Sequence, residues 1–291
     1  VQNEEAKTGV TVLLFDKKTG AVVGVDISGG GPASRETPLT SPVTADNPIN
    51  AIVLSGGSAY GLAASDGVMR CLEEHGIGFE TGYAKVPLVC QSCIYDLGYG
   101  SATVRPDSEM GYAACEKALA GGNPSSGSVG AGTGATVGKI CGMERAMKSG
   151  LGMYAVQLGE LRMAAVVAVN ALGDIFDSST GRKIAGLRTE DGTAFSDSCE
   201  ELWKMGQREN LFTGNTTIGA VITNGKFNKA QMNKIASMTR NAYARCINPV
   251  GTMADGDSIY AASAGEVEAD LNVAGTLAAY VMERAIVAAI R

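Results

Sequence analysis

The sequence of 291 residues has few aromatic residues and no excess of positive charge. Aromatic residues make up 5% of the chain and glycine occurs 39 times, so the core must be built from closely packed aliphatic side chains. The formal net charge is −6, and Lys and Arg are not clustered, which disfavours a nucleic-acid partner because nothing would neutralise phosphates. No apolar run reaches about 18 residues, and the first residues do not resemble a signal peptide, so we expect no membrane partner.

Cysteine and histidine exclude several kinds of catalysis. The seven cysteines are an odd number scattered through a long chain, which indicates reduced thiols in the cytoplasm. Cys90 and Cys93 form a CxxC motif, but it lacks the second pair of a zinc site and the βαβ setting of a redox site. His75, the sole histidine, stands at the polar end of a predicted helix, where it favours the helix C-terminus. Classical Ser-His-Asp or Cys-His catalysis would therefore depend on one poorly placed residue.

Hydrophobic periodicity predicts hairpins in combination with amphipathic helices. Two hairpins are expected, with strands at 8–15 and 21–28 and at 153–158 and 161–169. Further strands are expected at 51–54, 86–97 and 216–223. Helices are expected at 59–75 with Ser58 as N-cap, 108–120, 199–206, 228–246 with Asn228 as N-cap, and 267–290. This order favours one domain over residues 1–291, built as two stacked sheets covered by helices, an α/β sandwich rather than a parallel doubly wound sheet.

The glycine-rich segment 126–139 invites comparison with a phosphate-binding loop. A P-loop requires glycine at Thr133 and Ser or Thr after Lys139, so the segment fails that test. It contains a loose G-x-G-x-x-A dinucleotide pattern, but polar residues precede it where a strand is required. We expect instead that the backbone N–H groups of Gly130, Gly132 and Gly134 approach a reacting carbonyl group, with Lys139 aimed at the same place. A plain surface loop is the alternative.

Thr216 lies at the start of a predicted apolar strand, directly after Gly214 and Asn215. A hydroxyl group there could attack the preceding carbonyl group if the backbone were strained, and Thr216 would become a new N-terminus. Its α-amine could then act as the general base, because the reference α-amino pKa of about 8 suits proton transfer near neutral pH. The alternative is that Thr216 and Thr217 are ordinary β-forming residues at the start of a strand.

Several motifs in a fixed order resemble the L-aminopeptidase/D-alanyl-esterase-amidase (DmpA) family. That family includes β-peptidyl aminopeptidases and 6-aminohexanoate-oligomer (nylon-oligomer) hydrolases. The motifs span the chain and lie at 54–62, 86–89, 94–97, 127–139, Asn170, 215–218 and 255–257. The resemblance implies an αββα fold similar to that of ornithine acetyltransferases, and self-cleavage before a Ser or Thr. It implies no metal and no cofactor.

The resemblance also implies a role for each matching residue. Thr216 matches the nucleophile, and Asn215 the residue at the new C-terminus, which gives an α chain of 1–215 and a β chain of 216–291. Tyr60 matches a tyrosine that faces the scissile carbonyl group, Lys139 a lysine near the nucleophile, and Asn170 an asparagine that helps hold the oxyanion.

Asp255 and Asp257 match the acidic pair of the nylon-hydrolase branch, where the peptidase branch has Ser and Glu. Two carboxylates one residue apart could hold the Thr216 ammonium group and the Lys139 side chain. A simple turn, or a fragment of a calcium loop whose other ligands are missing here, is the alternative interpretation of Asp-Gly-Asp.

The sequence therefore predicts an autoprocessing amide hydrolase acting on small peptides or ω-amino-acid amides. We also expect a homo-oligomer, a tetramer of αβ units or larger. One alternative is acyl transfer to an amine, which would need an acceptor that competes with water. The other is a binding protein without catalysis, which would stay uncleaved and trap no acyl group at Thr216.

Overall fold

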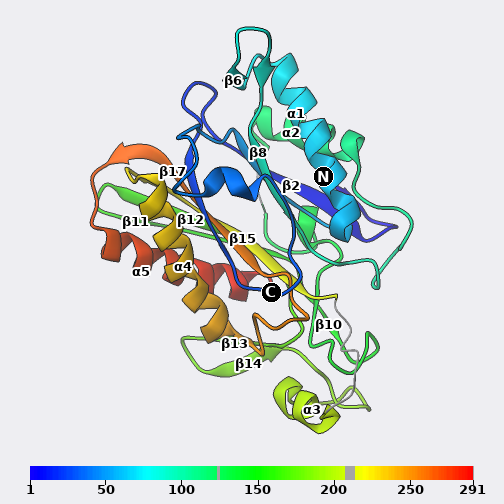
Figure 1. Cartoon of the computed structure of the whole chain (residues 1–291). Coiled ribbons are helices and arrows are strands. Elements are labelled where there is room, and N and C mark those ends of the chain that lie inside the picture. Colours follow the sequence, from blue (N-terminus) through cyan, green and yellow to red (C-terminus); the bar gives the residue numbers. More distant parts are fainter. Residues whose placement is uncertain (123–124, 207–213, 291) are drawn as a thin grey trace.

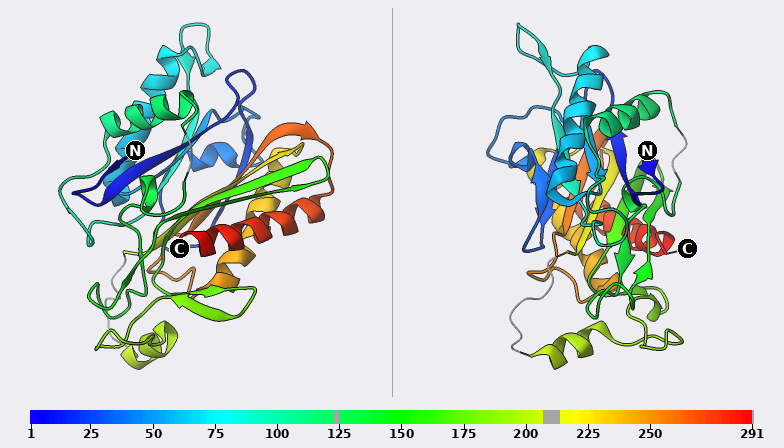
Figure 2. Two further views of the ribbon diagram at one scale, coloured as in Figure 1. Left: turned by 180° about the vertical axis from the view of Figure 1, so that it is seen from behind. Right: turned by 90° about the vertical axis from the view of Figure 1, so that its right-hand side faces the viewer.

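The computed structural model describes residues 1–122, 125–206 and 214–290. Within them, two five-stranded sheets pack face to face, and helices cover the outer face of each sheet (Figure 1). Both views in Figure 2 keep α1 and α2 together and apart from α4 and α5. The arrangement is the αββα sandwich that the sequence predicts.

The first sheet has the strand order β1-β2-β5-β8-β4. Its strands are β1 (Gln2–Asn3), β2 (Thr8–Leu14), β4 (Ala33–Arg35), β5 (Ala51–Ser55) and β8 (Val89–Cys93). The helices α1 (Ala64–Glu74) and α2 (Ser108–Leu119) pack on its outer face through a core that includes Val53, Val68 and Leu72. These apolar side chains recur at the helical and strand periods that predicted the elements.

The second sheet has the strand order β11-β12-β15-β17-β3. Its strands are β3 (Val22–Ile27), β11 (Leu151–Leu158), β12 (Leu161–Asn170), β15 (Thr216–Gly225) and β17 (Ser258–Val267). The helices α4 (Lys229–Cys246) and α5 (Leu271–Ala288) cover it. By length and composition α5 could span a membrane, but half of it is buried and it packs against α4, β11 and β12. It is therefore a core helix in this fold.

Shorter strands and helices complete the fold. The remaining strands are β6 (Phe79–Glu80), β7 (Lys85–Val86), β9 (Thr136–Val137), β10 (Met147–Lys148), β13 (Asp174–Asp177), β14 (Arg182–Ala185) and β16 (Ile247–Asn248). The short helices are η1 (Thr37–Thr40), η2 (Ser58–Ala63), η3 (Gly130–Gly132) and α3 (Ser198–Met205). In Figure 1, α3 lies at the opposite end of the molecule from α1 and α2.

The predicted first hairpin is wrong. β2 pairs with β5 in the first sheet, whereas β3 pairs with β17 in the second. After the turn that ends at Gly20, Ala21 exchanges two backbone hydrogen bonds of 2.9 Å with Ile49. The turn therefore passes the chain from one sheet to the other. Alternating apolar residues indicated two strands correctly, but they carry no information about which strands pair.

Three other predicted elements differ from the structure in their boundaries. Ser58 has a positive φ of 53° and does not cap a helix; its N–H donates to Ile94 O, and η2 precedes α1. The last helix begins at Leu271 rather than 267, because β17 continues to Val267 and Asp270 caps α5. The predicted strand 86–97 is two pieces, β7 and β8, separated at Pro87, which has no N–H to donate. The second hairpin and the helix after Asn228 are confirmed.

Candidate active site

Thr216 and Asn170 lie opposite each other where two strands of the second sheet meet. β12 ends at Asn170 and β15 begins at Thr216, and the antiparallel register pairs the two residues directly. Directly paired side chains lie on the same face of a sheet. Asn170 has no exposed surface, and Thr216 is 5% exposed. The sheet thus brings together two predicted site residues that are far apart in the sequence.

The peptide bond between Asn215 and Thr216 has a hydroxyl group and a backbone donor beside it. The Thr216 hydroxyl group donates a short hydrogen bond to the carbonyl oxygen of Asn215. The Gly256 N–H donates a hydrogen bond of 2.9 Å to the same oxygen. Such a donor stabilises the negative charge that develops when a carbonyl carbon is attacked. The predicted cleavage site therefore has a hydroxyl group and a backbone N–H beside its carbonyl oxygen, which are the kinds of group that a nucleophile and an oxyanion donor would be.

Gly256 is needed at this position for steric reasons. A Cβ atom there would lie 2.7 Å from Gly31 O and 2.9 Å from Thr216 Oγ1, closer than real side chains approach. The glycine therefore lets the Asp255–Asp257 segment approach the Asn215 carbonyl group. Sequence reasoning treated this segment only as a pair of carboxylates and missed the N–H between them.

The two aspartates are buried, and protein donors hold them in place. Asp255 Oδ2 accepts hydrogen bonds from the N–H and the hydroxyl group of Thr252 at 2.9 and 2.7 Å. Asp257 accepts one from the Thr217 N–H at 2.6 Å and one from the Gly251 N–H at 3.0 Å. Burial, followed by the neighbouring negative charge of Asp255, raises the pKa of Asp257 to about 7. Asp257 thus binds the backbone of the residue next to the nucleophile.

Lys139 is a buried lysine that contacts the residue before Asn215 and the strand partner of Thr216. Its Nζ donates to Asn170 O at 2.9 Å and to Gly214 O at 3.3 Å. Among the described residues, no carboxylate lies within ion-pair distance of Lys139. The expected direct contact of Asp255 and Asp257 with the Lys139 side chain is therefore not present. Burial lowers its pKa to about 7, against the opposing charges of Asp255, Asp257 and Asp96. Lys139 can therefore both accept and donate a proton near neutral pH.

A small cavity of about 30 Å³ lies beside Lys139, with Gly214 and Thr136 in its wall. Asp96 also lines it, and this residue was missed as a site residue although it lies in one of the family motifs. Its carboxylate accepts hydrogen bonds of 2.7 Å from Thr8 Oγ1 and the Gly57 N–H, and burial raises its pKa. The volume suits about one or two water molecules rather than a peptide.

Asn170 is held by its neighbours and keeps one donor position. Its Oδ1 accepts from the Thr136 N–H at 3.1 Å, and its Nδ2 donates to Tyr95 O at 2.9 Å. An amide NH2 group has two donors, so the second hydrogen of Nδ2 can serve an oxyanion. The predicted role of Asn170 is therefore compatible with its contacts.

Tyr60 is exposed, unlike the other predicted site residues, and the N–H groups of Gly130 and Gly132 make their hydrogen bonds away from Thr216. Tyr60 lies on η2 and is 63% exposed, and the Arg105 guanidinium lies 3.9 Å from its ring centre. Its role at the scissile carbonyl group stays a prediction. The Gly130 N–H donates to Gln2 Oε1, and the Gly132 N–H donates to Val129 O. These two N–H groups therefore have acceptors within the described structure, and the oxyanion role of Gly130 and Gly132 stays a prediction. The Gly256 N–H is the backbone donor that contacts the Asn215 carbonyl oxygen.

Gly134 packs closely against Asp96, next to the predicted site. A Cβ atom at this position would clash with Lys7 O and would lie 2.6 Å from the Cβ of Asp96. Its small size therefore allows the close packing of Asp96 beside Lys139. A buried threonine hydroxyl group, a carbonyl oxygen that accepts two hydrogen bonds and a buried lysine thus lie together, and these groups suit a class of enzymes that act on amide bonds.

Comparison with known proteins identifies the family. The model of peptidase family S58 matches residues 1–291, and the chain belongs to this family. It is 38% identical to an uncharacterized aminopeptidase of Mycobacterium leprae over 269 residues, which covers 90% of this chain and 72% of the relative. It is 33% identical to the 6-aminohexanoate-oligomer endohydrolase of Kocuria sp. over 272 residues, covering 91% and 72%.

Solved structures confirm the fold. The L-aminopeptidase D-Ala-esterase/amidase of Ochrobactrum anthropi aligns with a TM-score of 0.70 at 17% identity, covering 99% of this chain and 81% of that one. A beta-aminopeptidase of Burkholderia sp. aligns with a TM-score of 0.65 at 18% identity, with the same coverage. The predicted resemblance to the DmpA family is thus confirmed, and the chain is a hydrolase of amide bonds.

Proposed function

We propose that the chain cleaves itself between Asn215 and Thr216, giving an α chain of residues 1–215 and a β chain of residues 216–291. The observation that supports this is the Asn215 carbonyl oxygen, which accepts hydrogen bonds from both the Thr216 hydroxyl group and the Gly256 N–H. Thr216 Oγ1 attacks the carbonyl carbon, the C–N bond breaks, and an ester forms with release of the Thr216 amine. Water then hydrolyses the ester and leaves a carboxylate on Asn215.

Self-cleavage needs a base other than the α-amine, which does not yet exist. Lys139 suits this role because its pKa is lowered to about 7, so a large fraction is neutral at neutral pH. Its hydrogen bonds to Gly214 O and Asn170 O hold it between the residue before the cleaved bond and the strand partner of Thr216. In this proposal Lys139 takes the hydroxyl proton and passes it to the departing amine.

After cleavage, Thr216 acts on a separate amide. Its hydroxyl group attacks the substrate carbonyl carbon, and its own α-amine takes the proton and delivers it to the leaving amine. The oxyanion is held by the second Nδ2 hydrogen of Asn170 and by backbone N–H groups. Water then releases the acyl group. Small peptides or amides are the substrates we propose, as the names of the relatives suggest.

The size of the cavity beside Lys139 fits this order of events. A volume of about 30 Å³ does not admit a peptide, and Gly214 forms part of the wall. Cleavage after Asn215 releases the end of the α chain that includes Gly214. Self-cleavage would therefore both create the catalytic amine and allow the cavity to open.

Intact-mass spectrometry of the purified protein tests the proposal. Two fragments that meet between Asn215 and Thr216 are expected, together with an acyl adduct on the β-chain fragment after brief exposure to an activated ester. Adding a primary amine in large excess distinguishes hydrolysis from acyl transfer, because a transferase would give mainly the new amide. A single uncut chain that still turns over substrate would refute the proposal.

A further inference from the structure

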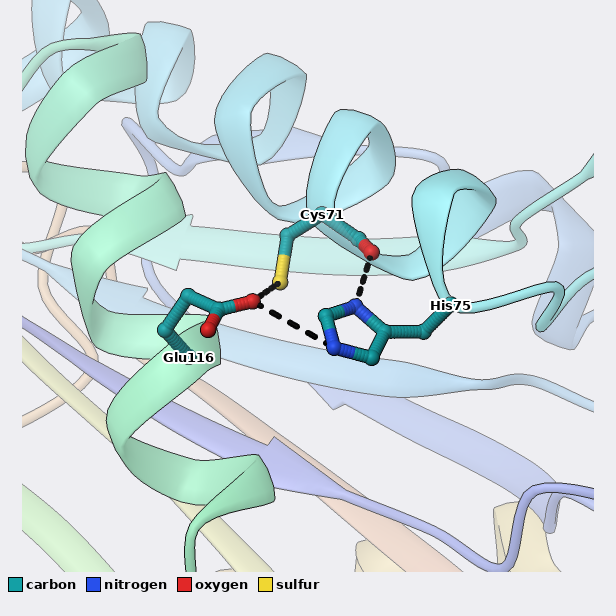
Figure 3. A group of neighbouring side chains, drawn as sticks. All are labelled: Cys71, His75 and Glu116. Carbon is teal, nitrogen blue, oxygen red and sulfur yellow. Dashed lines mark hydrogen bonds and ion pairs between the residues drawn. The ribbon is translucent and has the colours of Figure 1, made fainter.

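A second group of reactive side chains lies where α1 crosses α2 (Figure 3). Cys71 and His75 are one helical turn apart at the end of α1, and Glu116 projects from α2 toward both. One atom of each side chain, Cys71 Sγ, a ring nitrogen of His75 and a carboxylate oxygen of Glu116, lies within 4.8 Å of the other two. Thiolate, imidazole and carboxylate are the groups that bind zinc in proteins.

The spacing of the three atoms is close to that around a bound ion. Glu116 Oε1 lies 3.3 Å from Cys71 Sγ and 3.5 Å from His75 Nε2. Ordinary bond lengths to tetrahedral zinc place oxygen and sulfur ligands about 3.5 Å apart, and oxygen and nitrogen ligands about 3.3 Å apart. The two distances from Glu116 Oε1 are therefore within a few tenths of an ångström of those around a tetrahedral ion, and the sulfur and nitrogen atoms lie within 4.8 Å of each other.

The orientation of the imidazole ring supports a metal ligand. His75 Nδ1 lies 2.8 Å from the backbone carbonyl oxygen of Cys71, and a carbonyl oxygen can only accept, so Nδ1 carries the hydrogen. In the neutral ring, Nε2 then presents a lone pair toward Glu116 Oε1, which is also electron-rich. The two atoms repel each other unless a proton or a metal cation lies between them. A hydrogen bond from the second ring nitrogen to a carbonyl group is the usual support of a histidine that binds metal.

The surroundings leave room for entry and for a fourth ligand. The His75 and Glu116 side chains are 37% and 44% exposed, whereas Cys71 is buried. Solvent can therefore reach the cluster from one side, and a water molecule can complete four-coordination. The buried thiol of Cys115 neighbours Cys71, so a second sulfur borders the cluster.

We propose that Cys71, His75 and Glu116 bind one divalent ion of the zinc type, with water in the fourth position. The ion joins the end of α1 to α2 and so stabilises the helical layer over the first sheet. The cluster lies at the opposite end of α1 from η2, and β6 and β7 lead from there to the start of β8, whereas Asp96 follows the end of β8. The site is therefore structural, separate from Thr216.

Titration of the untagged, reduced and chelator-treated protein tests this site. Zn²⁺ is followed by calorimetry, and Co²⁺ by the absorption band that a thiolate–cobalt bond produces. One ion per chain is expected, and His75→Ala and Glu116→Gln should each weaken binding by about 100-fold or more, since even indirect partners of a metal cost 10- to 100-fold. Cys141→Ser is the matched control, because Cys141 is a free, partly exposed cysteine elsewhere and its loss should change nothing.

His75 and Glu116 are partly exposed, so their variants are expected to fold, and melting without metal checks this. Zn²⁺ should raise the melting temperature of the natural chain but not that of His75→Ala. His75 is the sole histidine, so its ring nitrogens can be followed by NMR without ambiguity. Absence of binding, absence of the thiolate band, or equal affinity in His75→Ala would overturn the proposal and leave a hydrogen-bonded ion pair.

Discussion

Two groups of polar side chains in this molecule differ in their burial and in their hydrogen-bond partners. Around Thr216, the charged residues Lys139, Asp255 and Asp257 are buried, and most of their hydrogen bonds are to the backbone. At the crossing of α1 and α2, His75 and Glu116 are partly exposed and face each other. Burial moves the pKa values of Lys139 and Asp257 toward 7, which suits proton transfer. The exposed side chains of His75 and Glu116 instead direct lone pairs toward each other, which suits the binding of a cation.

Residue type alone therefore does not identify the chemical role of a side chain. A lysine and two aspartates would form ordinary ion pairs on a surface, but here burial moves the pKa of Lys139 and of Asp257 to about 7. If the comparison is correct, changes around Thr216 should alter cleavage and turnover. Changes at the α1–α2 crossing should alter metal binding and melting.

The largest effect is expected for Thr216→Ala, which should leave one uncut chain because no nucleophile remains. Thr216→Ser keeps a hydroxyl group and should still be cut. Thr217→Val is the matched control: it removes a neighbouring buried hydroxyl group that has no hydrogen-bond partner among the described residues, and cleavage should continue. Intact mass reports each result. A Thr216→Ala protein that splits at the same bond would exclude Thr216 as the nucleophile.

Lys139→Met should slow self-cleavage by about 10³-fold, within the range for a lost general base. The lowered pKa of about 7 also sets the pH dependence. Below that pH Lys139 carries a proton and cannot accept another, so cleavage of freshly translated protein should accelerate as the pH rises from 6 to 8. Band intensities on a denaturing gel measure the rate.

Lys148→Met is the control for Lys139, because burial also lowers the pKa of Lys148, to about 8, and its Nζ also binds backbone carbonyl groups. It donates to Gly132 O and Ala135 O instead of flanking the cleaved bond. Normal cleavage is expected for Lys148→Met. Equal slowing of the two variants would mean that any half-buried lysine matters for folding, and that Lys139 is not the base.

Asn170→Ala should lower the turnover number of processed enzyme by about 10²-fold, the scale of one lost oxyanion donor. The hydrogen bonds to Thr136 and Tyr95 are also lost, so thermal melting is recorded with the kinetics. A variant with a lower melting temperature and an unchanged kcat would show that Asn170 only stabilises the ends of the strands.

The smallest effect is expected for Asp255→Asn in enzyme that is already cut. A carboxylate beside an ammonium group favours the charged form and raises its pKa, and the free amine is the active base. Removing the charge should therefore move the acidic limb of the kcat/KM profile to lower pH by about one unit. An unchanged profile with an altered KM would place Asp255 in contact with substrate instead.

Local patterns in the sequence were enough for much of the fold. The hairpin of β11 and β12 and the capped helix after Asn228 follow from a two-residue turn and from Asn-x-x-Gln at a helix start. The partners of β2 and β3 could not be predicted, because β2 pairs with β5 and β3 with β17, and Ala21 between them bridges to Ile49 beyond a long loop. Ser58 failed as a cap because contact with Ile94 O holds it at a positive φ.

By itself the sequence determined the order of the motifs, and with it the family and the sandwich, and it predicted Thr216, Lys139 and Asn170 as site residues. Only the tertiary structure decided that the Gly256 N–H contacts the Asn215 carbonyl oxygen. It alone also decided that Asp96 lies beside Lys139. The physical reason is that hydrogen-bond partners and burial depend on segments that are distant in the chain, and pKa values follow from burial.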